Sequence, residues 1–147
     1  NQEMKNSILF LIVFQSIIGC KTTYYDTSEL NEVPPEGLNQ SIAKDVVHMI
    51  SESFPPAQTK IFFPRGGSEL ASMIDKELRG MGYAVTDESG SRKKLDVQLA
   101  YKMSFVGEKF YILRLVAGEN FQINRVYQKA KDGKIIASGP VLMRRGE

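Results

Sequence analysis

Residues 95–143 read LDVQLAYKMSFVGEKFYILRLVAGENFQINRVYQKAKDGKIIASGPVLM, and this stretch decides the fold. From Leu95 to Phe105, apolar side chains alternate with polar or small ones, which is the period of a β-strand and not of a helix. Glycine-containing turns then separate three more segments of strand composition, at residues 109–116, 121–129 and 134–143. The stretch therefore predicts a four-stranded antiparallel meander.

Three local features refine this meander. The 109–116 segment is apolar at nearly every position, which predicts a strand covered on both faces. Asp132-Gly133 predicts a two-residue hairpin turn between the last two strands. Gly139-Pro140 predicts either a bulge or a sheet edge, because proline cannot donate a hydrogen bond to a neighbouring strand.

Two helices and two short strands precede the meander. Apolar residues at helical spacing predict a first helix over residues 38–54, and they are Leu38, Ile42, Val46, Met49, Ile50 and Phe54. Pro55-Pro56 ends it, since proline disfavours helical geometry in the preceding residue. A second helix is expected over residues 69–80, with Ser68 as its N-cap and Gly80 or Gly82 as its stop. Residues 59–63 and 83–86 are predicted strands.

This order of elements predicts the fold class. Two amphipathic helices and a sheet with one apolar face give a compact two-layer α+β domain, with the helices packed on a mixed, mainly antiparallel sheet. The domain covers residues 38–147, and its roughly 110 residues are enough for a core without disulfide support.

The charge balance and the rare residue types narrow the function classes. The chain has 147 residues, of which 19 are basic and 17 acidic, so the formal net charge is +2. This balance does not indicate nucleic-acid binding, which favours a basic stripe. One cysteine and one histidine exclude an intrachain disulfide framework and an ordinary zinc site made by this chain alone.

The only cysteine follows a secretion signal. Met4-Lys5 and an apolar run over residues 8–14 are followed by Ile17-Ile18-Gly19-Cys20, which predicts a signal peptide over residues 1–19. Ile17-Ile18-Gly19-Cys20 resembles the bacterial lipobox. That resemblance implies cleavage after Gly19, a diacylglycerol thioether on Cys20 and a further acyl chain such as palmitate on the new amino terminus. The alternative is an ordinary buried cysteine near a short N-terminal membrane helix.

The residues after Cys20 give a location and a tether. Under the enterobacterial sorting rule, Asp directly after the lipidated cysteine keeps a lipoprotein in the inner membrane. The residue here is Lys21, which by analogy favours the periplasmic face of the outer membrane. Residues 20–37 contain Pro34-Pro35 and many polar residues, so they are expected to form a flexible tether. Tyr24-Tyr25 is the aromatic exception, and it is either a solvated pair or a contact for the membrane or a partner.

No catalytic set is apparent, so the chain is expected not to be an enzyme and to need no cofactor or metal. His48 is expected on the helix surface. Arg65-Gly66-Gly67-Ser68 could hold an anion at a helix N-terminus, although a plain turn fits the sequence better because the Walker pattern is missing. The candidate carboxylates are expected on solvated faces and loops, and they are Asp75, Glu77, Asp87, Glu88 and Asp96.

Several further segments carry a family resemblance. They are residues 54–61, residues 70–78 leading to Arg79-Gly80-Met81-Gly82-Tyr83-Ala84-Val85, Asn124-Arg125-Val126-Tyr127 and Ala137-Ser138-Gly139-Pro140. Together with the lipobox they resemble the TrbH family of conjugal transfer lipoproteins over nearly the whole chain. Cys20 is the only functional residue that this resemblance supplies.

The resemblance implies an anchoring subunit of a type IV secretion core complex at the outer membrane. The implied partners are membrane lipid through Cys20, larger periplasmic subunits resembling TrbG and TrbI, and other copies of this chain in a ring. Related lipoproteins carry a small domain like the N0 domain of secretins. The competing hypothesis is a free-standing periplasmic binding or inhibitor lipoprotein, and an enzyme is the third.

Overall fold

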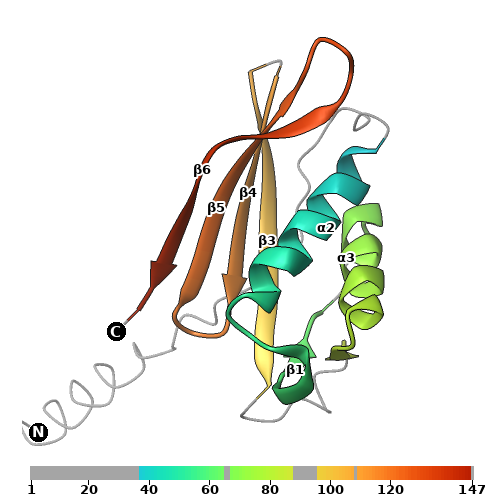
Figure 1. Ribbon diagram of the computed structural model, residues 1–147, viewed down its shortest axis with the longest axis vertical. Helices are drawn as coiled ribbons and strands as arrows, with labels where there is room; N and C mark the ends of the chain where they lie inside the picture. The colour runs from blue at the N-terminus through green and yellow to red at the C-terminus, as the bar shows by residue number, and fades with distance from the viewer. Residues whose placement is uncertain (1–36, 65–66, 88–95, 108, 147) are drawn as a thin grey trace, which may run out of the picture.

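The computed structural model describes residues 37–64, 67–87, 96–107 and 109–146 (Figure 1). The elements in chain order are α2 (Leu38–Ser51), the 3-10 turn η2 (Pro56–Gln58), β1 (Lys60–Phe62), α3 (Glu69–Gly80), β2 (Ala84–Thr86), β3 (Val97–Val106), β4 (Phe110–Ala117), β5 (Phe121–Lys129) and β6 (Ile135–Arg145). The six strands form one sheet in the order β2-β1-β3-β4-β5-β6. Two helices packed on a mixed, mainly antiparallel sheet confirm the predicted two-layer α+β fold.

The two helices form where the apolar spacing predicts them, and their ends follow local chemistry. The Ser68 side chain accepts a hydrogen bond from the Ala71 backbone N at 3.1 Å, as expected for an N-cap. Gly82, with φ of 97°, supplies the left-handed stop after α3. Helix α2 ends at Ser51, three residues earlier than predicted, and the chain then turns toward Pro55, with the Phe54 N bonded to the Ile50 O at 2.9 Å.

The N-terminal half supplies the parallel part of the sheet. Strand β1 lies between β2 and β3 and runs parallel to both, with Ile61 opposite Val85 on one side and Val97 on the other. Parallel neighbours need a crossover connection, and α3 provides it between β1 and β2. The helix is thereby placed over the sheet next to α2.

The C-terminal half is the predicted meander, with β3, β4, β5 and β6 pairing antiparallel in chain order. The β5–β6 register shifts between Asn124 and Val126, opposite Gly139, whose φ is 77°. Strand β6 is one of the two edge strands of the described sheet, β2 being the other. Both features predicted for Gly139-Pro140, a bulge and an edge, are therefore present.

The hairpin prediction at Asp132-Gly133 is wrong in length. The Gly133 N donates to the Ala130 O at 3.0 Å, and the Ala130 N donates to the Lys134 O at 2.8 Å. The loop therefore has three residues, with Gly133 in the left-handed conformation at its last position (φ of 84°). A turn followed by one left-handed residue matches the twist of the strands as well as the shorter loop does.

The prediction that the 109–116 strand is covered on both faces is also wrong. Tyr111, Leu113 and Leu115 are buried under the helices, whereas Ile112 and Val116 are only half-buried. An antiparallel sheet can keep apolar residues on an uncovered face, where they contact neighbours on adjacent strands. We call the helix-covered side of β3–β6 the inner face and the other side the outer face.

Candidate functional site

Cys20, the lipidation site predicted from the sequence, lies outside the described residues, as do the signal peptide and residues 20–36 of the tether. The described part of the site is therefore the surface of the α+β domain and the polar side chains within it.

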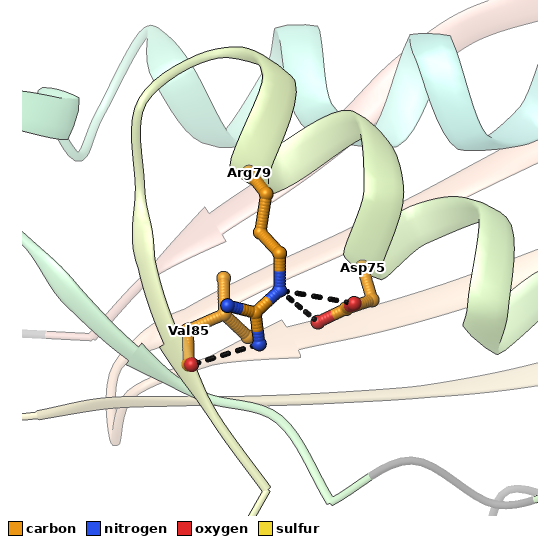
Figure 2. Close-up of polar contacts among 3 residues, drawn as sticks. All are labelled: Asp75, Arg79 and Val85. Atoms are coloured by element: carbon orange, nitrogen blue, oxygen red, sulfur yellow. Dashed lines mark hydrogen bonds and ion pairs between the residues drawn. The ribbon is translucent and has the colours of Figure 1, made fainter.

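Asp75 corrects one prediction, because its carboxylate is buried and not solvated. Asp75 is 7% exposed and accepts hydrogen bonds from the Arg79 Nε at 3.2 Å and 3.1 Å through its two oxygens. The Arg79 Nη2 also donates to the Val85 backbone O at 3.0 Å. Figure 2 shows the guanidinium between the Asp75 carboxylate on α3 and the Val85 carbonyl on β2. This arrangement fixes the short edge strand β2 to the helix.

Asp96 also departs from the sequence expectation. Its side chain is 4% exposed and lies 3.9 Å from the Lys60 Nζ, which joins the start of β3 to β1. Glu77 is half-buried and accepts from Gln40 at 3.0 Å, and Asp87 is exposed. Glu88 lies outside the described residues. Asp75 and Glu77 thus lie on α3, whereas Asp87 follows β2 and Asp96 precedes β3.

A second polar cluster was not predicted from the sequence. The Asp45 carboxylate on α2 accepts from the Tyr127 hydroxyl at 2.7 Å and from the Arg125 Nε at 3.2 Å. The Arg125 Nη1 donates to the Gly139 O at 3.4 Å, so the cluster also reaches the bulge in β6. Burial raises the pKa of Tyr127, and the hydrogen bond to Asp45 raises it further. The available signal was Asp45 itself, a charged residue directly beside the apolar residue Val46 of the helix.

The remaining polar candidates have structural partners. His48 is exposed on α2, as expected, and its Nε2 lies 3.6 Å from the Glu52 carboxylate. The Ser68 hydroxyl caps α3 and shares a hydrogen bond of 2.7 Å with the Tyr101 hydroxyl. Arg65 and Gly66 of the possible anion site lie outside the described residues. In the described part of the chain, every buried side-chain nitrogen and oxygen has a hydrogen-bond partner.

Within residues 37–64, 67–87, 96–107 and 109–146, no three His, Cys, Asp or Glu side chains gather where they could hold a metal ion. No helix in these ranges has the length and apolarity needed to span a bilayer.

The described helices leave the outer face of the meander uncovered. Its side chains form cross-strand rows, and one such row joins Lys102, Arg114, Asn124 and Leu142. Lys102 and Arg114 are exposed, as is Arg144 in the next row, and no acidic residue occupies the outer positions of β3–β6. This face is therefore cationic and partly apolar, as is suited to binding a partner surface.

The ends of two hairpins add to this surface. We call Val106, Phe110, Ile136 and the lysines Lys109, Lys129 and Lys131 the hairpin end. A shallow groove of about 470 Å³ lies there, lined by Lys109, Gln128, Lys129, Ala130, Lys131 and Ile136. A second groove, of about 240 Å³, lies at the opposite end of the meander, near Glu119 and Arg144.

Comparison with known proteins gives one family. Residues 22–147 match the family model described as conjugal transfer protein TrbH. No curated protein and no solved structure matches the chain. The match includes both helices, the whole sheet and the two polar clusters, and it agrees with the resemblance seen in the sequence. The chain belongs to the TrbH family of conjugal transfer proteins.

Proposed function

We propose that this chain is an outer-membrane lipoprotein that anchors and supports the core complex of a type IV secretion apparatus for conjugal transfer. The observation that carries the proposal is the lipobox Ile17-Ile18-Gly19-Cys20 behind a charged and then apolar leader. The family match begins at residue 22, so the lipobox is independent of that match. Conjugal transfer fits a type IV secretion role, and a lipid anchor gives the domain a fixed place in the envelope.

The number of acyl chains explains how one modified cysteine could hold the domain. A single acyl chain binds a bilayer only marginally, whereas two or more chains give stable attachment. A thioether-linked diacylglycerol and an amino-terminal acyl chain on Cys20 would supply three. Lys21 favours sorting to the outer membrane, which would place the domain on the periplasmic face.

The domain itself supports an assembly role more than a catalytic one. Asp45 and Asp75 are each held by an arginine. The Arg125–Asp45 pair joins the sheet to α2, and Arg79, paired with Asp75 on the same helix, also donates to the Val85 O on β2. The outer face and the outer edge of β6, which no other described strand pairs, offer surfaces for protein contacts, because a strand edge can add a strand from a partner. We propose that the partners are the larger periplasmic subunits resembling TrbG and TrbI and further copies of this chain in a ring.

Two substitutions in the native host test the anchor. Cys20→Ser removes the acylated sulfur, so we expect the folded domain to lose its lipid and plasmid transfer to fall. Lys21→Asp keeps Cys20 and serves as the matched variant: the protein is expected to stay lipidated but to move to the inner membrane. Mass spectrometry of the purified protein and density separation of the membranes give both results. An unmodified Cys20 thiol in the parent protein would refute the proposal.

Affinity purification from detergent-treated membranes tests the proposed assembly. The parent protein should bring down the large periplasmic subunits of the transfer apparatus, and Lys21→Asp should bring down fewer. Recovery of the lipidated protein only as a monomer would favour the free-standing lipoprotein instead.

A further inference from the structure

The hairpin end combines exposed apolar side chains with lysines. The described residues have six exposed large apolar side chains, and three of them are Val106 (49% exposed), Phe110 (39%) and Ile136 (49%). Strand pairing aligns Val106 with Phe110, Phe110 with Gln128, and Gln128 with Ile136. The three apolar side chains therefore lie in one row across the outer face, at the edge where the hairpins turn.

The lysines beside this row lack acidic partners among the described residues. Lys109, Lys129 and Lys131 are exposed and line the groove together with Ile136. The one acidic residue that the structure describes at these turns is Asp132, and it lies 3.4 Å from the Lys134 Nζ. The groove is thus lined by three lysines and the exposed Ile136, which is the chemistry that binds an anionic and partly apolar surface.

The domain is joined to the predicted tether at this same end. Phe54, after the end of α2, packs on Phe121 at the start of β5, and Asp45 is bonded to Tyr127 near the end of β5. Helix α2 therefore runs opposite to β5, and its first residue, Leu38, lies toward the hairpin end. Figure 1 shows the start of α2 and the two hairpin turns at the upper end of the molecule.

We propose that the hairpin end rests on anionic phospholipid of the membrane that carries the acylated Cys20. The inference rests on the proposed function, because the anchor brings the domain to that membrane. The lysines would contact headgroup phosphates, and Val106, Phe110 and Ile136 would enter the interface. A membrane is favoured over an acidic protein because the apolar row and the lysines lie at the end where the chain leads back to its anchor. That attachment makes docking intramolecular and lets modest contacts suffice.

Vesicles test this orientation with the lipidated protein purified from its host. Lipidation consumes the thiol of the only native cysteine, so an introduced cysteine can be labelled alone. Ala130→Cys places an environment-sensitive fluorophore in the groove, and the exposed Ala57→Cys on η2 is its matched control, beyond the end of α2. The vesicles contain phosphatidylcholine alone or phosphatidylcholine with phosphatidylglycerol, each with a lipid-borne quencher. We expect stronger quenching at position 130 than at 57, and only with phosphatidylglycerol.

Charge reversal identifies the cause of the quenching. The triple variant Lys109→Glu/Lys129→Glu/Lys131→Glu should lower the ratio of docked to free domain by about fivefold per lysine or more. The control Lys44→Glu/Lys76→Glu/Arg144→Glu makes the same net-charge change at exposed positions elsewhere and should keep the quenching. Circular dichroism checks that both variants fold.

The outcomes separate the inference from the function on which it rests. Equal quenching at positions 57 and 130, or equal loss in both triple variants, would overturn the orientation. The orientation would also be overturned if the triple variant Lys109→Glu/Lys129→Glu/Lys131→Glu blocked plasmid transfer while the quenching at position 130 remained, since that result indicates a protein partner. A parent protein whose Cys20 itself takes the fluorophore would refute the lipid anchor, while phosphatidylglycerol-dependent quenching at position 130 would still support the lysine contact.

Discussion

The two faces of the meander differ although they come from the same strands. On β4, Leu113 and Leu115 are fully buried against the helices, while Ile112 and Val116 are half-buried and Arg114 is exposed on the other side. The difference does not follow from hydrophobicity, because both faces carry large apolar residues. It follows from α2 and α3, which cover one face, so the apolar side chains of the outer face remain uncovered by the other described elements.

Shortening adjacent side chains that face opposite sides of β4 should reveal the difference between the two faces most strongly. Leu113→Ala should lower the free energy of unfolding by about 3 kcal/mol, because the site is closely packed and a cavity remains. Ile112→Ala should lower it by about 1 kcal/mol or less, since the half-buried site leaves no closed cavity. Urea denaturation followed by circular dichroism measures both. Similar losses at the two positions would mean that the outer face is covered as well.

The Asp45 carboxylate places a charge against the inner face, and its removal should have the next largest effect on stability. Asp45→Ala removes the acceptor for Arg125 and Tyr127, whose polar groups then lie largely buried without it, so we expect a loss of about 2 kcal/mol. Asp132→Ala, which removes an exposed ion pair at a hairpin turn, is the control and should change stability by less than about 1 kcal/mol. Equal losses of unfolding free energy in the two variants, measured by urea denaturation, would show that the Asp45 hydrogen bonds add nothing to the stability that the surrounding packing provides.

The third prediction uses the raised pKa of Tyr127. In the unfolded chain a tyrosine ionises near pH 10, whereas burial and Asp45 hold Tyr127 protonated to higher pH in the folded state. Its contribution is therefore complete below about pH 10 and is lost as the pH rises above it, by up to about 1.4 kcal/mol per pH unit. Tyr127→Phe should lack this component. Parallel denaturation curves from neutral to alkaline pH compare the two, and an unchanged pH dependence in the variant would contradict it.

Much of this fold follows from local sequence. The second helix (69–80) and the strand over 121–129 have the predicted bounds because their apolar periods are long and end at capping or turn residues. The pairing of β1 with β3 could not be predicted, since residues distant in sequence meet there without a local pattern. The Asp75–Arg79 pair differs, because its i,i+4 spacing on a predicted helix is a local signal. The burial of Asp75 and the bond from Arg79 to the Val85 O depend on where β2 lies, and the spacing does not show that.

The candidate site was less predictable than the fold. The lipobox is a local pattern, so Cys20 could be named directly from the sequence. The hairpin end depends on strand register, which aligns Val106, Phe110 and Ile136 from three strands. A three-residue loop in place of a two-residue loop also changes which side chains near Gly133 face the groove. The sequence could therefore predict four strands and still leave this surface unrecognised.

The smallest effect is expected from a charge change on the outer face. Lys102 and Arg114 are directly opposite each other on β3 and β4, and like charges in that position destabilise a sheet. Lys102→Glu replaces the repulsion by an ion pair and should raise the free energy of unfolding by about 0.5 kcal/mol. If the outer face served only to pack the strands together, Lys102→Glu would not impair plasmid transfer. If the cationic outer face binds a partner, the more stable variant should transfer plasmids less well. Greater stability with unchanged transfer would show that the charge of this row has no role in binding.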